Sequence, residues 1–270
     1  MTDFRCQLAD AWTGTLDPAK RYISEPKLDG MRCLLFLDPN EPRALSRNGK
    51  PVKNMGKIVE ACMQVAAGLV IDGELFAGDW HSSISAGRAE GSTIERKLWA
   101  FDAIPLEDFN RQSSAIPLRE RKQILREFGA VEGIKVVPSR SVTSPAEVLE
   151  VVQEYVKAGF EGGVIKDLDA PYLFDRGGAW MKLKFCQDAE FPCVSVYEGG
   201  GRLKGSLGGI VINVNGVEVG VGTGFNDLER DHFWQHPESI VGKLVTVEYQ
   251  RKSPYGSLIS PVFLRVRESD

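Results

Sequence analysis

Residues 24–32 read SEPKLDGMR, and the apolar run CLLFL follows directly at 33–37. Lys27 in this stretch stands between a proline, which favours extended backbone, and an Asp-Gly pair, which favours a turn. The apolar run that comes next predicts a buried strand. The pattern therefore places a lysine at the mouth of a strand, which is a position suited to a nucleophile.

A lysine acts as a nucleophile only through its neutral amine. An ordinary lysine has a pKa of about 10.4, so at pH 7 only about one in a few thousand carries a free amine. Burial, neighbouring cations and a bound metal ion all favour the neutral form. Lys27 is therefore a candidate nucleophile only if groups of this kind converge on it in the fold. Otherwise it is a surface lysine beside a turn.

Length and composition restrict the class of protein. A chain of 270 residues predicts one or two domains. The net charge of −4 does not itself indicate nucleic-acid binding, but a local group of lysines and arginines is enough for that purpose. The five cysteines include no Cys-x-x-Cys pair, which favours reduced thiols. With no signal-like amino terminus and no membrane-length apolar stretch, we expect a cytoplasmic protein without a membrane partner, located in the host cytoplasm if its source is viral.

The first part of the chain alternates strand and helix patterns. We predict strands at 31–37, 44–47, 69–76, 98–104, 134–137, 160–166 and 180–185, and helices at 55–66, 117–128 and 145–159. Gly68 stands where a glycine commonly ends a helix, and Ser144-Pro145-Ala146-Glu147 combines a capping box with proline at the first helical position. The polar residues 79–97 predict a long loop, which we expect to face a ligand.

The periodicity of the sequence changes past Cys186. Helical periodicity largely disappears, and short strands are predicted at 192–197, 211–214, 217–219, 244–249 and 262–266. Asn215-Gly216 predicts a hairpin turn. A sheet of about five short strands is typical of a small closed OB barrel. The predicted class is α+β, with antiparallel sheets flanked by helices in a domain at 1–186 and a β-barrel OB-fold domain at 187–270.

Charged and aromatic residues gather at the predicted strand ends of the first domain: Lys27, Asp29, Arg32, Arg47, Glu74, Phe101, Glu161, Lys166, Lys182 and Lys184. Taken singly, these are solvated charges and a core phenylalanine. Together they supply an amine, cations for phosphoryl oxygens, carboxylates for a divalent metal and a flat apolar face. Attack on the α-phosphate of a nucleoside triphosphate requires all four kinds of group.

In order and spacing, these motifs resemble the ATP-dependent DNA ligases, in the minimal two-domain form of bacteriophages and bacteria within the covalent nucleotidyltransferase superfamily. The matching segments are KLDGMR (27–32), SRNG (46–49), DGE (72–74), the strand around Phe101, EGGVIK (161–166) and KLK (182–184), with 205–209, 221–225 and 256–263 in the second domain. Lys-x-Asp-Gly alone is shared with RNA ligases, capping enzymes and NAD-dependent ligases, whereas the ordered set is specific.

The resemblance implies a nucleotidyltransferase (adenylation) domain that uses ATP and Mg²⁺, with Mn²⁺ as a substitute. Lys27 would carry AMP, and Lys182 and Lys184 would contact the α-phosphate. Glu161 and Asp29 would serve the metal site. The remaining nucleotide-binding residues are Glu25, Arg32, Glu74, Phe101, Lys166 and Arg267. The family commonly ends with Arg-x-Asp-Lys, whereas this sequence reads RESD over 267–270.

The implied partner is nicked duplex DNA, and the chemistry needs only a monomer. Candidate DNA contacts are Arg47, Lys50, Arg88, Lys204 and Lys252. Two alternatives remain from the sequence. One is a GTP- or ATP-dependent RNA capping enzyme or RNA ligase, and the other is a non-catalytic DNA-binding module with the same fold.

Overall fold

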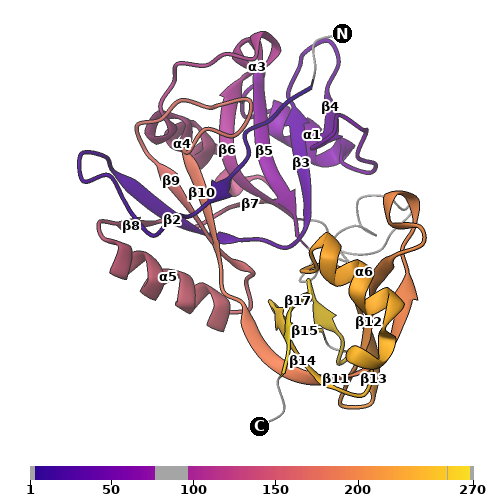
Figure 1. The fold of residues 1–270 in the computed structure, drawn as a ribbon. Helices are drawn as coiled ribbons and strands as arrows, with labels where there is room; N and C mark the ends of the chain where they lie inside the picture. The colour runs from indigo at the N-terminus through magenta and orange to yellow at the C-terminus, as the bar shows by residue number, and fades with distance from the viewer. Residues whose placement is uncertain (1–3, 77–96, 254, 268–270) are drawn as a thin grey trace. The chain divides into compact units, whose positions relative to one another are not determined.

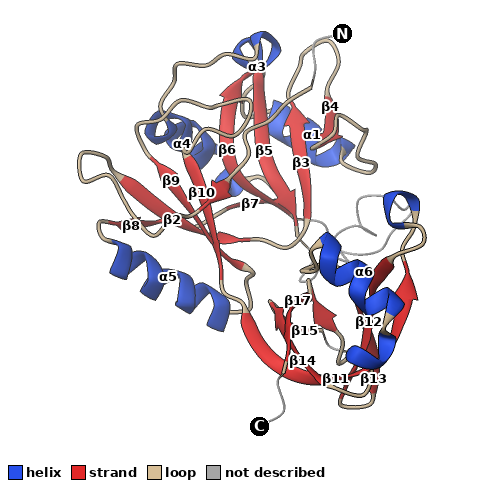
Figure 2. Cartoon of the chain, viewed as in Figure 1, coloured by secondary structure: helices blue, strands red, loops and turns tan. Residues whose placement is uncertain are grey.

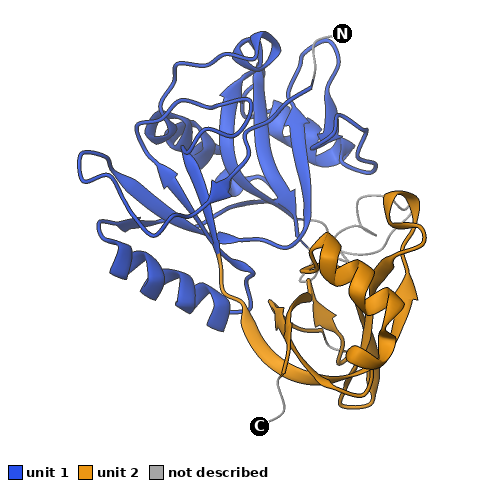
Figure 3. Ribbon diagram, viewed as in Figure 1, with its two compact units in different colours: residues 1–183 blue, residues 184–270 orange. Residues whose placement is uncertain are grey.

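Two five-stranded sheets form the framework of the chain up to Leu183 (Figure 1). This computed structural model describes residues 4–76, 97–253 and 255–267. The chain divides into two compact units, Met1–Leu183 and Lys184–Asp270 (Figure 3). Each unit combines strands with helices (Figure 2), which confirms the predicted α+β class.

The first sheet carries Lys27. Its strands lie in the order β1 (Asp10–Ala11), β10 (Trp180–Lys184), β9 (Gly162–Asp167), β2 (Tyr22–Lys27) and β8 (Arg140–Val142). Strands β2 and β9 are antiparallel, and Lys27 lies opposite Gly162 while Glu25 lies opposite Val164. Because alternate residues of a strand share a face, Lys27 and Glu25 project from the same side of this sheet.

The second sheet has the order β4 (Arg43–Ser46), β3 (Met31–Phe36), β5 (Leu69–Leu75), β6 (Leu98–Pro105) and β7 (Ile134–Val136). Its two faces contribute side chains to different hydrophobic cores. Cys33 and Leu35 of β3 pack with residues of helix α1 (Gly56–Met63), whereas Leu34 and Phe36 belong to a cluster that includes Trp180 of the first sheet. The second face of this sheet therefore packs against the first sheet.

Among the described residues, three further α-helices belong to this unit: α3 (Leu106–Arg111), α4 (Leu118–Arg126) and α5 (Pro145–Lys157). A 3₁₀ turn, η1 (Glu127–Ala130), extends α4. The prediction that Gly68 ends the helix at 55–66 is wrong, because α1 ends at Met63 with Gln64 as its C-cap. Gly68 instead has a positive φ of 76° and donates its N–H to the Leu37 carbonyl at 2.7 Å, which starts β5.

The start of α5 agrees with the sequence only in part. Ser144 caps the helix by accepting a hydrogen bond from the Glu147 N–H at 3.2 Å, and Pro145 is the first helical residue. The Glu147 carboxylate, however, accepts from the N–H and hydroxyl of Thr143. In a capping box the Glu147 carboxylate would accept from the N–H of Ser144, so these hydrogen bonds differ from that reciprocal pattern.

The second unit is a curled five-stranded sheet in the order β13 (Val217–Val221), β12 (Leu207–Val214), β11 (Gln187–Glu198), β14 (Leu244–Tyr249) and β17 (Val262–Val266). Short strands β15 (Arg251–Lys252) and β16 (Leu258–Ile259) form a separate pair. The two edges of the main sheet approach at a bridge between Thr223 and Val262. The predicted hairpin at Asn215-Gly216 joins β12 to β13, and both turn residues have positive φ.

Helix α6 (Asp227–Gln235) corrects the expectation that helical character largely disappears past residue 186. Asn226 and Glu229 form a reciprocal capping box at its start. Arg230 of this helix is buried and donates to the carbonyl oxygens of Leu207, Gly208 and Gly222. These bonds fasten the helix to the sheet. None of the helices in the described ranges is long and apolar enough to cross a membrane.

Candidate active site

Lys27 and Glu161 form an ion pair at the ends of β2 and β9. The side chain of Lys27 is 22% exposed and that of Glu161 is 7% exposed, so the pair is sheltered but reachable. The Glu161 N–H also donates to the Lys27 carbonyl at 3.0 Å, which fixes the two residues to each other through the backbone. The structure thus brings together the expected nucleophile and the expected metal ligand.

The turn between β2 and β3 depends on a close backbone approach. A Cβ at Gly30 would collide with the carbonyl oxygen of Leu75, the last residue of β5. Only glycine lets the Asp-Gly turn lie against that strand. The motif that contains Lys27 is therefore seated on the strand that carries Glu74.

Glu25 lies two residues before Lys27 on β2 and is almost fully buried. Its Oε1 is paired with the Lys122 ammonium, and its Oε2 lies 2.7 Å from the Lys166 Nζ. Burial lowers the pKa of Lys166 to about 8; Glu25 opposes this change, and the like charge of Lys122 adds to it. A buried carboxylate is expected to have such partners, because an unpaired charge is costly to bury.

Phe101 of β6 projects toward two cations. Lys166 Nζ lies 4.6 Å from the centre of its ring, and the Arg32 guanidinium carbon lies 4.9 Å from it. The edge-on ring of Trp180 is 5.7 Å away between centroids. Phe101 is partly exposed, so it offers a flat apolar face bordered by positive charge.

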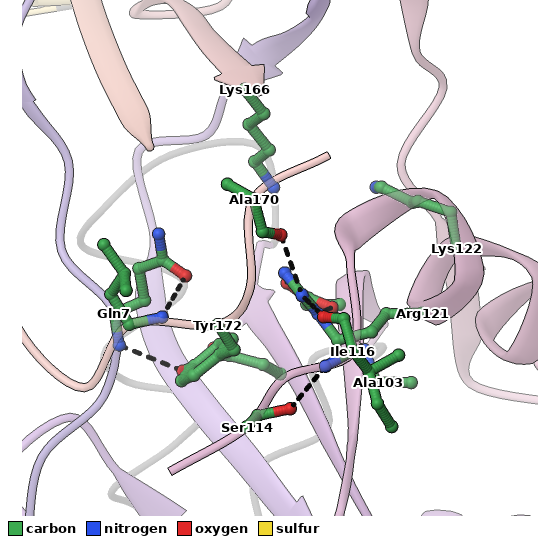
Figure 4. A network of polar contacts seen from close by, with 12 residues as sticks. Gln7, Ala103, Ser114, Ile116, Arg121, Lys122, Lys166, Ala170 and Tyr172 are labelled. Carbon is green, nitrogen blue, oxygen red and sulfur yellow. Dashed lines mark hydrogen bonds and ion pairs between the residues drawn. The ribbon is translucent and has the colours of Figure 1, made fainter. Parts of the chain in front are cut away.

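Arg32 is held by a buried network. Its Nε and Nη2 donate to Asp72 at 2.6 and 2.5 Å, and Nη2 also donates to the Gln7 carbonyl at 3.1 Å. The Tyr172 hydroxyl donates to Asp72 at 2.7 Å and accepts from the Gln7 N–H at 3.0 Å. Figure 4 shows the link between Gln7 and Tyr172. Because two of the three guanidinium nitrogens, Nε and Nη2, are hydrogen-bonded, Arg32 has little freedom to reorient.

Glu74 lies directly opposite Arg32 in the pairing of β3 with β5. Burial raises the pKa of the Glu74 carboxyl to about 7, although Arg32 and Lys27 act in the opposite direction. A carboxyl that is half ionised near neutral pH can both accept and donate hydrogen bonds, which suits recognition of hydroxyl groups.

Lys182 and Lys184 lie on β10, and Asp29 lies in the turn after β2. Within the described ranges, no group of three or more His, Cys, Asp or Glu side chains is placed to hold a metal ion. Mg²⁺, however, is commonly held by one or two carboxylates together with phosphate oxygens. The carboxylate oxygens of Glu161 and Asp29 are ligands of the kind that Mg²⁺ prefers.

The family described as "ATP dependent DNA ligase domain" matches residues 6–184, which is well over half of the chain. The chain belongs to the ATP-dependent DNA ligase family. A second family, described as "DNA ligase OB-like domain", matches residues 198–267 of this ligase-family chain. The recognition made from the motifs is therefore confirmed.

Individual relatives agree with this family. A probable DNA ligase of Beutenbergia cavernae is 33% identical over 196 residues, covering 68% of this chain and 38% of the relative. The solved structure named Pmar-Lig_PreS3 has a TM-score of 0.84 and 29% identity, covering 97% of this chain and 67% of that one. A Lig E DNA ligase structure has a TM-score of 0.81 over 97% and 99% of the two chains, and at 23% identity it shows the fold alone. The chain spans 38%, 30% and 43% of the length of three curated relatives that it matches.

The candidate DNA contacts of this ligase-family chain are scattered over both units. Arg47 and Lys50 are exposed in the turn after β4, Lys204 is exposed before β12, and Lys252 is exposed on β15. Arg88 and most of the polar loop at 79–97 lie outside the described residues. Arg267 lies just after β17, and its Nη1 lies 2.6 Å from Glu190 of β11.

Sequence reasoning missed two residues of this site. Asp72 falls inside the DGE motif but was assigned no role, although it holds Arg32. Lys122 was not singled out at all. A signal for it exists, because Leu118, Arg121, Lys122 and Leu125 follow the i, i+3, i+4, i+7 spacing of the buried face of α4. Two basic residues on that face predict buried acidic partners.

Proposed function

We propose that this chain is an ATP-dependent DNA ligase that seals nicks in duplex DNA through a covalent lysyl-AMP intermediate. The observation that carries the proposal is the position of Lys27, paired with Glu161 at the end of a strand that also carries Glu25. Family membership supports the same activity.

In the first step, Lys27 Nζ attacks the α-phosphorus of ATP. A P–N bond forms, the bond between the α-phosphorus and the oxygen that bridges to the β-phosphate breaks, pyrophosphate leaves with that oxygen, and the attacking nitrogen releases one proton to water. Glu161 holds the amino group of Lys27 before this step. Lys182 and Lys184 take up charge that develops on the α-phosphate oxygens. In the next two steps, AMP passes to the 5′-phosphate of the nick, and the 3′-hydroxyl displaces AMP to form the phosphodiester.

The adenosine of ATP would lie with its base on Phe101, with Glu25 and Lys166 at the edge of the base. Arg32 and Glu74, which face each other across β3 and β5, would hold the ribose. Glu161 and Asp29 would hold Mg²⁺, which when bound neutralises charge on the phosphates. Mn²⁺ has the same preference for oxygen ligands.

The two units would divide the work, with an adenylation domain at 1–186 and an OB-fold domain at 187–270. Arg267 of the second would contact the leaving pyrophosphate. DNA would be bound by Arg47, Lys50, Arg88, Lys204 and Lys252. Each of these side chains that neutralises one phosphate would contribute about −0.9 to the slope of log affinity against log salt concentration. We infer a monomer that acts in the cytoplasm, or in the host cytoplasm if the source is viral.

Transfer of label from [α-³²P]ATP to the protein tests the first step, and sealing of a nicked duplex tests the whole reaction. We expect a labelled adduct and a sealed strand with ATP, and neither with the Lys27→Ala variant. An adduct that persists in Lys27→Ala by intact mass would overturn the assignment of the nucleophile.

Parallel reactions separate the alternatives. Preferential labelling by GTP, or sealing of RNA but not DNA, would favour a capping enzyme or RNA ligase. Tight binding of nicked DNA without any adduct would favour a non-catalytic module. Sealing with NAD in place of ATP would contradict the choice of nucleotide.

A further inference from the structure

The buried carboxylate of Glu25 is shared by two lysines from different elements. Lys166 comes from β9 of the same sheet, and Lys122 comes from helix α4. The side chains of Glu25, Lys122 and Lys166 are 2%, 10% and 3% exposed. Two cations therefore face one anion in a nearly dry site. The Glu25 carboxylate is therefore the acceptor that both ammonium groups share.

Helix α4 is fixed firmly enough to aim Lys122. The preceding residue, Arg121, is fully buried and donates to both carboxylate oxygens of Asp102, at 2.8 and 3.0 Å. It also donates to the Ala170 carbonyl at 3.3 Å (Figure 4). Asp102 directly follows Phe101 on β6. The helix is thus tied to the strand that carries the proposed base platform.

The amino groups of Lys122 and Lys166 contact different oxygens of the Glu25 carboxylate. Figure 4 shows these lysines extending from the helix and from β9. Lys122 contacts Oε1 of Glu25 and Lys166 contacts Oε2, so the two lysines together fix the orientation of the Glu25 carboxylate plane. A carboxylate has about four lone-pair sites, so this arrangement leaves acceptor capacity on both oxygens.

The cluster borders the aromatic platform. Lys166 Nζ lies 4.6 Å from the centre of the Phe101 ring and 4.0 Å from that of Trp180. A purine on Phe101 would therefore have its edge beside Lys166 and the Glu25 carboxylate. This step rests on the proposed function, which places the base there.

We propose that Lys122 is a positioning residue of the nucleotide site, which fixes Glu25 as an acceptor for the exocyclic amino group of adenine and thereby sets the preference for ATP over GTP. Adenine presents a donor, its amino group, at the position where guanine presents a carbonyl oxygen. A carboxylate held as an acceptor binds the first and repels the second. Without Lys122, Glu25 keeps its contact with Lys166 but loses the contact that sets its plane.

The test compares self-adenylylation of the full chain with ATP and with GTP. Lys122→Met keeps most of the aliphatic side chain, and because Glu25 remains paired with Lys166, the fold should survive. We expect the KM for ATP to rise about tenfold with little change in kcat, as for the loss of one charged hydrogen-bond arrangement. The ratio of kcat/KM for ATP to that for GTP should fall by a similar factor.

Two variants serve as controls. Lys122→Arg restores a cation at the same position and should recover most of the preference for ATP. Arg126→Met removes an exposed charge at the end of the same helix and should leave both constants unchanged. Thermal unfolding of each variant separates a loss of fold from a loss of recognition.

The outcomes separate this inference from the function on which it rests. If the wild-type chain forms no adduct with either nucleotide, the proposed function fails. If it forms the adduct with ATP and Lys122→Met keeps both the wild-type KM and the wild-type ratio of ATP to GTP, the role of Lys122 is overturned. A fall in kcat alone would also overturn it, because a positioning residue for the base acts on nucleotide binding.

Discussion

The guanidinium of Arg32 is joined to the carboxylate of Asp72 by two hydrogen bonds, from Nε to Oδ1 at 2.6 Å and from Nη2 to Oδ2 at 2.5 Å. The Asp72 side chain is fully buried and that of Arg32 is 15% exposed. Asp72 is thus the buried counterion of a residue proposed to hold the ribose. The fixed geometry of the pair gives Arg32 its direction before any nucleotide arrives.

Replacing Asp72 by asparagine should destabilise the fold and weaken nucleotide binding together. The Asp72→Asn change leaves the Arg32 guanidinium nearly buried without a counterion, which costs about 2–4 kcal/mol of unfolding free energy. Urea unfolding measures this loss. Tyr172→Phe is the matched control, because it keeps the ion pair of Arg32 with Asp72 and removes only the neutral hydroxyl that bonds Asp72 and the Gln7 N–H, which should cost about 1–2 kcal/mol. Equal losses in the two variants would contradict the role of the ion pair.

Glu74 should make the stability of the protein depend on pH. Its pKa is raised to about 7 by burial, above the ordinary value of 4.5. Between pH 4.5 and 7, the Glu74 carboxyl is therefore protonated in the folded state and ionised in the unfolded state. This contribution to stability is fully present below pH 4.5 and is lost as the pH rises through 7. Glu74→Gln should be more stable than wild type at pH 8 by about 1–3 kcal/mol and close to it at pH 4.5. A difference that stays constant across this range would exclude Glu74 as the cause.

Lys166 should make ATP binding weaken at alkaline pH. Burial lowers its pKa to about 8, against the opposing effect of Glu25 and with the help of Lys122. Above pH 8 the neutral amine has lost the charge that attracts a nucleotide, so the dissociation constant for ATP should rise there. Calorimetric titration from pH 6.5 to 9.5 would measure the midpoint. Lys122→Met removes the like charge and should move the midpoint to higher pH, whereas a midpoint unchanged in Lys166→Met would assign the effect to another group.

The strands and the main site motifs were predictable because they carry local signals. The apolar runs that became β3, β5 and β6 are long enough to be recognised without tertiary context, and the lysine at the mouth of β3 follows from the turn chemistry of Asp29-Gly30. Helix α6 was not predicted, because the strand patterns on both sides of it favoured an all-strand interpretation, although Asn226 and Glu229 have the spacing of a capping box.

The site residues that the sequence did not predict have partners that lie far away in the sequence. Lys122 lies 97 positions from Glu25 in the sequence, and Tyr172 lies 100 positions from Asp72. Nothing local distinguishes a lysine that reaches a buried acid from one that reaches solvent. The spacing of buried positions on α4 narrows the choice, but the identity of the partner comes only from how the helix packs on β6.

Arg267 should affect the first chemical step and leave stability almost unchanged. Its ion pair with Glu190 is partly exposed, with side chains 50% and 37% accessible, so losing it should cost less than about 1 kcal/mol. If Arg267 contacts pyrophosphate, Arg267→Ala should slow self-adenylylation by about tenfold or more, while a pre-adenylylated sample of the variant should seal nicks at close to the wild-type rate. Arg265→Ala is the matched control, because Arg265 is an exposed arginine on β17, two residues before Arg267. Slow self-adenylylation in Arg265→Ala with a normal rate in Arg267→Ala would transfer the role to Arg265. Equal slowing of both steps in Arg267→Ala would instead indicate that Arg267 serves DNA binding or the shared phosphate site.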